Sequence, residues 1–260
     1  MDTGKPRISA CMVLYNAGEE ALKAVECLEK SDVNVDLYLV DNSPTTSSTA
    51  AQIAWKYPGV KVLKQDRNLG FGRGNNVVLP LLESEYHLLI NPDVTFEPDL
   101  LSRMIAYMDA RPNAAILTPR VFSEDGEEQF LPKRQPTIRY LLGGFLEKLG
   151  KPFKQWRAEY TLQDEHVSTP IQVQFATGCF LLIRTEIFDR LNGFDERFFL
   201  YQEDSDLSRR VLESNIGPII YHPDMHVTHA WKRENTRTLK GTMRQIVSVC
   251  KFFGKWGIKW

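Results

Sequence analysis

The first 120 or so residues alternate between short apolar segments and amphipathic ones, and this alternation constrains the fold more than any other feature. The apolar segments predict buried strands at 7–14, 35–40, 60–64, 86–90 and 114–118. The amphipathic segments predict helices at 19–30, 47–57 and 99–110. Strands that alternate with helices form βαβ units, so we predict an α/β fold with a mostly parallel central sheet flanked by helices.

Polar side chains follow three of these predicted strands at the point where each strand ends. They are Tyr15-Asn16, Asp41-Asn42 and Asn91-Pro92-Asp93. Ligands of such sheets bind beyond the carboxyl ends of the strands, so we expect a ligand site here. The Asp93 carboxylate can hold a divalent cation that also binds diphosphate oxygens. Taken alone, however, the tripeptide is an equally good Asn-Pro turn that ends a strand.

Residues 66–76 combine three glycines, two arginines and three asparagines. We predict a glycine-rich loop at 70–74 that opens into a helix through Leu82. Glycines let backbone N–H groups approach an anion, and the positive end of a helix favours a phosphate. A simple turn is the alternative, because the spacing does not match the G-x-G-x-x-G dinucleotide fingerprint.

The second half of the chain begins with a proline-rich stretch at 122–170, which predicts an insertion with short helices. A helix predicted at 203–214 then starts with the carboxylates Glu203, Asp204 and Asp206. Capping explains one or two of them. One can instead act as a general base, which must be ionised at pH 7.

Three histidines lie close together at 222, 226 and 229. Each taken singly is more often a polar loop residue than a metal ligand. Val227 and Thr228 favour an extended segment over a helix. One of the histidines can join Asp93 on a metal ion.

Residues 231–260 carry eight Lys and Arg side chains against the single acid Glu234. Within them, Met243, Ile246, Val247, Cys250 and Phe253 recur at helical spacing, with Trp256 and Trp260 beside this stripe. A basic amphipathic helix of this kind suits an anionic membrane surface. Docking of the stripe on the core or on another subunit is the alternative. A monomer and an oligomer are both compatible with this pattern.

The rest of the composition is ordinary. No run approaches eighteen apolar residues, and the first six residues lack the form of a signal peptide. We therefore expect a cytoplasmic protein, with peripheral attachment to the inner face of the cell membrane as an option through the basic helix. The four cysteines form no C-x-x-C pair and are expected to be free thiols.

Taken in order, these segments resemble the family 2 glycosyltransferases with the GT-A fold, and among them the bacterial rhamnosyltransferase-like branch. The resemblance runs from about Ile8 to His229. The matching segments are 13–16, 40–43, 68–76, 89–93, 177–180, 193–196 and 199–206. The resemblance implies a GT-A domain at 1–230, with a nucleotide-binding half at 1–120 and an acceptor and catalytic half at 121–230, followed by the basic amphipathic tail at 231–260.

The resemblance also implies roles for individual residues. It makes Asp204 the catalytic base, with Glu203 second and Asp206 in support. Asp93 and His229 would hold Mg²⁺ or Mn²⁺, and Asn91 replaces the first acid of the D-x-D motif. The residues implied in donor binding are Tyr15, Asn16, Asp41, Asn68, Gly70, Gly72, Arg73, Asn75 and Asn91, with Asp41 recognising the nucleoside.

The implied activity is an inverting, metal-assisted hexosyl transfer. It moves a sugar, L-rhamnose from dTDP-L-rhamnose, to a saccharide or lipid-linked acceptor in bacterial cell-surface polysaccharide synthesis. A nucleotidyltransferase that makes sugar nucleotides is one alternative, but it needs a phosphate loop after the first strand, and residues 15–18 are not one. A non-catalytic nucleotide-sugar-binding module is another, and it has little use for Asp204 beside Asp93. No stacking or groove-reading motif indicates a nucleic-acid partner.

Overall fold

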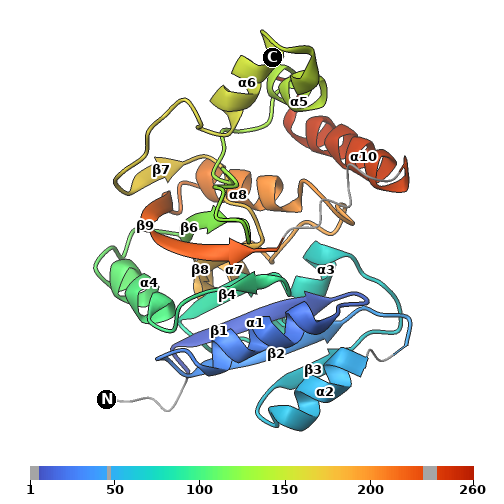
Figure 1. Ribbon diagram of the computed structural model, residues 1–260, viewed down its shortest axis with the longest axis vertical. Helices are drawn as coiled ribbons and strands as arrows, with labels where there is room; N and C mark the ends of the chain where they lie inside the picture. The colour runs from blue at the N-terminus through green and yellow to red at the C-terminus, as the bar shows by residue number, and fades with distance from the viewer. Residues whose placement is uncertain (1–5, 46–47, 231–238) are drawn as a thin grey trace.

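The computed structural model describes residues 6–45, 48–230 and 239–260 (Figure 1). Nine strands of these residues form one sheet in the order β3-β2-β1-β4-β8-β6-β9-β5, and β7 pairs with β9. The strands are β1 (Ile8–Leu14), β2 (Val35–Asp41), β3 (Lys61–Lys64), β4 (Tyr86–Ile90), β5 (Val94–Thr95), β6 (Ile116–Phe122), β7 (Ile171–Val173), β8 (Phe180–Arg184) and β9 (Ile219–His229).

Helices cover the sheet and extend beyond one end of it. The α-helices are α1 (Glu19–Glu29), α2 (Ser48–Lys56), α3 (Phe71–Asn76), α4 (Leu100–Asp109), α5 (Ile138–Leu146), α6 (Phe153–Tyr160), α7 (Thr185–Arg190), α8 (Glu203–Glu213) and α10 (Leu239–Trp256). Two 3₁₀ helices are η1 (Leu79–Leu81) and η2 (Glu147–Leu149). The predicted alternation of strands and helices is confirmed, as are the short helices of the insertion.

The sheet divides into a parallel half and a mixed half. Strands β3, β2, β1 and β4 are parallel neighbours, as the βαβ pattern predicts. Strand β8 is antiparallel to both β4 and β6, and β9 is parallel to β6 but antiparallel to β5 and β7. The direction of β8 has a simple cause. The connection from β6 to β8, which contains α5, α6 and β7, returns the chain to the end of the sheet at which β6 ends, so β8 runs back antiparallel to β6.

Both faces of the sheet are covered. Leu88 of β4 packs with Met12, Val25 and Leu101 in a core that involves α1 and α4. Its neighbour Leu89 points to the other face and joins a second core with residues of α7 and α8. Burial on both faces explains why the second half of β4, Leu88–Ile90, is continuously apolar and could be predicted without an alternating pattern.

The glycine-rich segment differs from its prediction, because α3 begins at Phe71 and includes Gly72 and Gly74. The predicted loop at 70–74 is therefore wrong, and so is the helix through Leu82, since α3 ends at Asn76. A Cβ atom at Gly72 would lie 2.9 Å from Cβ of Phe194, and one at Gly74 would lie 2.9 Å from Val13. These glycines allow a helix to touch its neighbours closely, a tertiary reason that the local sequence does not reveal.

The C-terminal helix α10 packs on the rest of the molecule, beside α5 and α6 (Figure 1). Phe252 and Phe253 form a buried cluster with Phe198. The predicted stripe mostly faces away from this contact: Met243, Ile246 and Val247 are 60%, 43% and 47% exposed. The helix thus has a docked apolar face and an exposed one. No helix of the described residues is long and apolar enough to cross a bilayer. The predicted tail also includes 231–238, which lie outside those residues.

Candidate active site

The three polar strand ends predicted as a site lie along one edge of the sheet. Strands β2, β1 and β4 are parallel neighbours, so their carboxyl ends are adjacent. Asp41 is fully buried, its Oδ1 accepts a hydrogen bond from Ser43 N at 3.0 Å, and Lys64 Nζ lies 3.5 Å from its Oδ2. Ser43 Oγ also accepts from Asn16 N at 3.0 Å, while Tyr15 is 52% exposed. The first two strand ends are therefore joined through Ser43.

The segment 68–76 contacts this edge and also the second half of the chain. Asn42 Nδ2 donates to Gly70 O at 3.0 Å, and Asn68 Oδ1 accepts from Gly70 N at 2.8 Å. Phe71 N donates to Phe199 O at 3.1 Å, directly before the acidic helix. Gly70 has a φ of +82°, and a Cβ atom there would lie 1.9 Å from Phe199 O, so a side chain cannot be accommodated.

Two predicted donor-binding residues of this segment already have partners within the protein. Arg73 Nε donates to Glu196 O at 2.9 Å, and Asn75 Nδ2 donates to Phe71 O at 3.0 Å. Arg73 therefore joins α3 to the segment before α8, whereas the bond of Asn75 lies within α3 itself. Gly72 packs closely against Phe194, which leaves no room for a side chain at this position. Contacts of these three residues with a donor stay a prediction.

The structure brings Asp93 and His229 together. Oδ1 of Asp93 lies 3.3 Å from Nε2 of His229. Val94, the residue after Asp93, pairs with His229 between β5 and β9, and Ala230 N donates to Asp93 O at 2.9 Å. Alternation along β9 places His229 on the buried side. His222 and His226 lie on the other side, against the rings of Tyr107 and Phe122.

Gln129, which the sequence did not single out, orients His229. Gln129 Nε2 donates to the backbone oxygen of His229 at 2.7 Å, which turns its Oε1 toward Nδ1 of the same residue at 3.1 Å. The amide oxygen can only accept, so Nδ1 carries the proton and Nε2 presents a lone pair toward Asp93. Fixing the tautomer through the second ring nitrogen is typical of metal-binding histidines.

This donor set fits a divalent cation. A carboxylate oxygen and an imidazole nitrogen are acceptors, and ligands of an octahedral ion at about 2.1 Å lie about 3 Å from each other. The measured 3.3 Å matches two neighbouring ligands of one ion. Among the described residues no group of three or more acids, histidines or cysteines gathers for a metal. A cation held here would therefore need further oxygen ligands from a bound diphosphate or from water.

Asp204 lies close to this pair through a short main-chain connection. Gly178 N donates to Asp204 Oδ2 at 3.3 Å, and Asn91 N donates to the oxygen of the next residue, Cys179, at 2.8 Å. Burial, followed by the charges of Asp93 and Asp204, raises the pKa of Cys179 to about 12, so both acids lie near this thiol. The predicted base and the predicted metal ligand thus flank the same short segment.

Glu203 and Asp204 have different environments. Burial, and then the charge of Asp204, raises the pKa of Glu203 to about 8, and its Oε2 has no hydrogen-bond partner among the described residues. Burial raises the pKa of Asp204 as well, but the charge of Lys133 and the N–H groups of Gly178 and Ser205 oppose this shift. The charged form of Asp204 is thus favoured by neighbours that Glu203 lacks, which makes Asp204 the better candidate of the two for a general base.

Asp206 is fully buried and contacts the C-terminal helix. Its Oδ1 accepts from Trp256 Nε1 at 2.8 Å and lies 2.6 Å from Lys255 Nζ, and its Oδ2 accepts from Arg210 Nε at 2.8 Å. Both of its oxygens thus have partners inside the protein. Asp206 joins α10 to α8, and its supporting role in catalysis stays a prediction.

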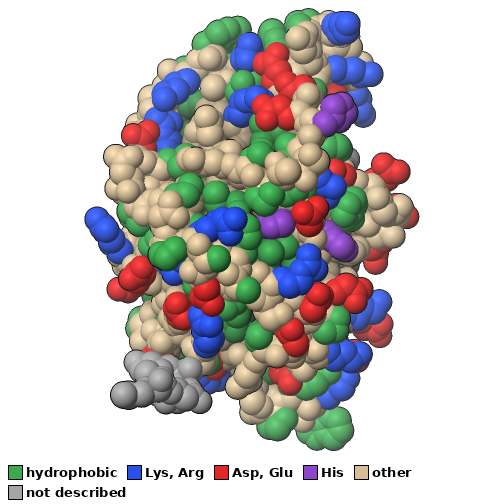
Figure 2. Space-filling view, turned by 90° about the vertical axis from the view of Figure 1, so that its left-hand side faces the viewer, with side chains coloured by type: hydrophobic (Ala, Val, Ile, Leu, Met, Phe, Trp, Pro, Cys, Tyr) green, Lys and Arg blue, Asp and Glu red, His purple; other side chains and the backbone are tan. Residues whose placement is uncertain are grey.

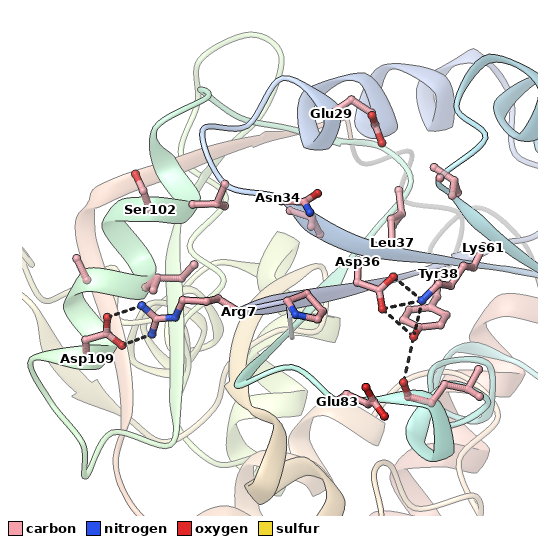
Figure 3. A pocket seen from close by; sticks show the side chains of 18 of the residues that line it. Arg7, Glu29, Asn34, Asp36, Leu37, Tyr38, Lys61, Glu83, Ser102 and Asp109 are labelled. Atoms are coloured by element: carbon pink, nitrogen blue, oxygen red, sulfur yellow. Dashed lines mark hydrogen bonds and ion pairs between the residues drawn. The ribbon is translucent and has the colours of Figure 1, made fainter. Parts of the chain in front are cut away.

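A cavity of about 1410 Å³ lies elsewhere, at the amino ends of the strands (Figure 3). Its charged side chains pair with one another: Lys61 lies 2.6 Å from Asp36, and Arg7 lies 2.8 Å from Asp109. Both cations of the cavity are thus paired with acids, and the cavity lies at the opposite edge of the sheet from Asp93, so it is separate from the candidate site.

Comparison with known proteins gives a consistent set of similarities. A family model described as glycosyl transferase family 2 matches residues 9–191. Over 208 residues the chain is 28% identical to an N-acetylglucosaminyl-diphospho-decaprenol L-rhamnosyltransferase of Mycobacterium tuberculosis. The aligned region covers 75% of this chain and 66% of the relative, so the chain spans just under two thirds of the length of that relative. Over 222 residues it is 25% identical to rhamnosyltransferase WbbL of Escherichia coli K12, covering 82% and 79%.

Solved structures give a similar result. The chain superposes on a mannosyltransferase of Pyrobaculum calidifontis in complex with GDP-Man and Mn²⁺, with a TM-score of 0.63 and 14% identity, covering 96% of this chain and 65% of that one. It also superposes on GalNAc-T7 with UDP, GalNAc and Mn²⁺, with a TM-score of 0.62 and 15% identity, covering 90% and 45%. At these identities the similarity concerns the fold.

Proposed function

Because this chain belongs to glycosyl transferase family 2 and has the GT-A fold, we propose that it transfers a sugar from a nucleotide-diphosphate donor to a saccharide or lipid-linked acceptor, with inversion. The observation that carries this proposal is the connection between Asp204 and the Asn91–Asp93 turn. Gly178 N binds the Asp204 carboxylate and Asn91 N binds the neighbouring Cys179 O, so a base and a cation site flank one small volume.

Asp204 is the proposed catalytic base. Its ionised carboxylate accepts the proton of the acceptor hydroxyl as that oxygen attacks the anomeric carbon. Glu203 keeps its own proton at neutral pH and leaves the negative charge on Asp204. A direct displacement needs one base and no covalent intermediate, so the product has the opposite anomeric configuration to the donor.

On the donor side, Asp93 and His229 would hold Mg²⁺ or Mn²⁺, and the ion when bound would offset the charge of the departing diphosphate. Asp41 would recognise the nucleoside at the end of β2, beside Tyr15 and Asn16. Asn91 and the segment 68–76 would border the diphosphate and the sugar. In this scheme residues 1–120 bind the nucleotide and residues 121–230 supply the base and the acceptor site.

The identity of the sugar rests on the relatives. Two of them are L-rhamnosyl- or rhamnosyltransferases by name, and one has a diphospho-decaprenol-linked acceptor in its name. We therefore propose dTDP-L-rhamnose as the donor and a lipid-linked saccharide as the acceptor, in the synthesis of a bacterial cell-surface polysaccharide.

We propose that the protein acts while bound to the inner face of the cell membrane. Large exposed apolar side chains gather on α5, η2, α10 and the residues after α10: Phe145, Leu149, Met243, Ile246, Val247, Ile258 and Trp260. Exposed cations accompany them: Lys148, Lys154, Arg244, Lys251 and Lys259. Blue and green side chains occur together at the upper end in Figure 2, where Figure 1 places α5 and α6. This combination suits an anionic lipid surface.

A donor screen tests the proposal directly. Purified protein with Mn²⁺ is mixed with dTDP-L-rhamnose, UDP-N-acetylglucosamine, UDP-galactose or GDP-mannose, and the unfolding temperature is measured. We expect dTDP-L-rhamnose to stabilise most. Transfer from that donor to a lipid-linked N-acetylglucosamine follows, with the anomeric configuration of the product determined by NMR. Retention of configuration would contradict the inverting reaction, and preference for another donor would contradict the assignment of rhamnose.

A further inference from the structure

Two cations of the insertion, Lys133 and Arg157, have no hydrogen bond or ion pair through their side chains among the described residues. Their neighbours in the same segment are paired. Arg139 Nη2 lies 2.6 Å from Glu159, and Arg134 binds Glu165. The other cations of the insertion that lack such a partner, Lys148, Lys151 and Lys154, are exposed, whereas Lys133 and Arg157 are partly buried.

Lys133 is held in place without using its N–H donors. Its backbone N donates to Phe175 O at 3.3 Å, and its Nζ lies 4.8 Å from the centre of the Phe175 ring and 5.8 Å from that of Tyr160. Aromatic faces stabilise an ammonium ion but provide no lone pair comparable to a carboxylate. All three N–H donors of the ammonium group therefore remain for another acceptor.

Lys133 lies near the candidate base, because its backbone N binds Phe175 O, and Gly178, three residues after Phe175, donates to Asp204 Oδ2. The charge of Asp204 acts on Lys133, and Cys179 responds to the charges of Lys133, Asp204 and Asp93 together. Burial, and then the charge of Arg157, lowers the pKa of Lys133 to about 8, so this side chain is still mostly charged at pH 7. Arg157 reaches the area from α6, where its side chain passes Gly144 of α5.

We propose that Lys133 and Arg157 form an anion-binding subsite beside Asp204 that receives a phosphate group of a substrate. Two neighbouring cations that form no ion pair repel each other, and this repulsion destabilises the folded protein. A bound phosphate offsets the repulsion and accepts hydrogen bonds from both side chains. The proposal rests on the proposed function for the identity of the substrate. A phosphate could come from the diphosphate of the donor or from a phosphate-linked acceptor, and the same side chains serve either.

Pyrophosphate in the presence of EDTA is the probe of this subsite, because it carries the phosphate chemistry without nucleoside, sugar or metal. Its affinity is measured by calorimetry for the unsubstituted protein and for Lys133→Gln, Lys133→Arg, Arg157→Gln and Lys154→Gln. Lys154 is an exposed cation of the same helix as Arg157 and serves as the matched control. We expect about tenfold weaker binding for Lys133→Gln and for Arg157→Gln, and unchanged binding for Lys154→Gln and Lys133→Arg.

The source of the phosphate is distinguished by a second titration, of dTDP with Mn²⁺. If Lys133→Gln weakens dTDP as much as pyrophosphate, the subsite binds the diphosphate of the donor. If dTDP binding is unchanged while pyrophosphate binding falls, the subsite belongs to a phosphate-linked acceptor. Equal pyrophosphate affinity in all five proteins, or no binding to the unsubstituted protein, would overturn the proposal. Both titrations measure binding alone, so a missing transferase activity would count against the proposed function and not against the subsite.

Folding of the variants is not expected to limit this experiment. The side chain of Lys133 makes no hydrogen bond and no ion pair among the described residues, so its replacement by Gln breaks no direct contact. It removes the repulsion between Lys133 and Arg157, and with it the attraction between Lys133 and Asp204, and these two effects oppose each other. The unfolding temperature of Lys133→Gln should therefore stay within about 4 °C of that of the unsubstituted protein, which would show that lost binding does not reflect lost structure.

Discussion

Trp256 donates its indole N–H to Oδ1 of Asp206 over 2.8 Å, and this bond joins the C-terminal helix to the helix that starts with Glu203 and Asp204. Lys255 adds contacts of 2.6 Å to Asp206 and 2.7 Å to Asp195. The basic tail therefore supports the candidate catalytic helix directly.

Replacing Trp256 by Phe should lower the free energy of unfolding by about 1–2 kcal/mol, because the fully buried Asp206 loses one of its donors. Chemical denaturation followed by circular dichroism measures this change. Trp260→Phe is the control, since Trp260 is 74% exposed and should change stability by no more than about 0.5 kcal/mol. Equal effects of the two substitutions would show that the bond to Asp206 contributes nothing.

The two neighbouring acids should respond differently to amide substitution. Asp204→Asn removes the ionised base and should lower the turnover rate by about 10²–10⁴-fold, with donor binding nearly unchanged. Glu203→Gln replaces a carboxyl that is already protonated and should keep activity within a few-fold of the unsubstituted enzyme. Steady-state kinetics with saturating donor measure both. Transfer that survives in Asp204→Asn would exclude it as the base.

Glu203 should also make stability depend on pH. Its pKa is about 8 in the folded protein against 4.5 ordinarily, so between these values the folded state binds a proton that the unfolded state has lost. The stability it contributes is complete below pH 4.5 and is lost as pH rises through 8, by up to about 1.4 kcal/mol per pH unit. Glu203→Gln should not lose it, so the stability of the variant relative to the unsubstituted protein should increase over this range. A difference that is constant from pH 5 to 8 would contradict the assignment.

Gln129 should matter for metal binding although it does not touch the ion. Without its amide the His229 ring can adopt the other tautomer or rotate, so Gln129→Ala should weaken Mn²⁺ binding in the presence of dTDP by about 10–100-fold. Electron paramagnetic resonance of free Mn²⁺ gives the affinity. Gln172→Ala, on the exposed side of β7, is the control. His229→Ala should weaken binding at least as much as Gln129→Ala, and the reverse order would contradict the tautomer argument.

The membrane proposal is best tested on the exposed face of α10, because removal of the whole helix would also remove its bond to Asp206. The double variant Met243→Gln with Ile246→Gln should float less with vesicles that contain anionic lipid than the unsubstituted protein does. Trp55→Gln is the control, since Trp55 is 87% exposed but lies on α2, away from α10. Equal flotation of the double variant and the unsubstituted protein would exclude a membrane contact through this face.

Much of the fold could be predicted because its buried strands appear in the sequence as short, mostly apolar segments. Strands β1 and β4 are apolar except for Ser9 and His87, and their ends carry the polar residues that the structure places along one edge. The extended segment that ends at His229 could also be predicted, from its β-branched residues. The proximity of Asp93 and Asp204 was implied by a family resemblance and not by local pattern, because it depends on contacts across Gly178 and Cys179.

Other features had no local signal. Gln129 and Lys133 lie in an irregular segment, where their role depends on which strands the insertion crosses. The helical pattern of α10 contains two apolar faces, and periodicity cannot indicate which one packs. The structure docks Phe252 and Trp256 and exposes Met243, because Phe198 and Asp206 are located where the former reach them.

Strand β8 lies in the middle of the sheet between β4 and β6, yet it is translated long after β4. About 90 residues separate the end of β4 at Ile90 from the start of β8 at Phe180. At a synthesis rate of about 5–20 residues per second, the nascent chain exposes the apolar edge of β4 for roughly 5–20 s before its partner is translated. An unpaired edge of this kind is a template for aggregation. Expression at reduced temperature, or with added chaperones, should therefore affect the yield of this protein more than its final stability would indicate.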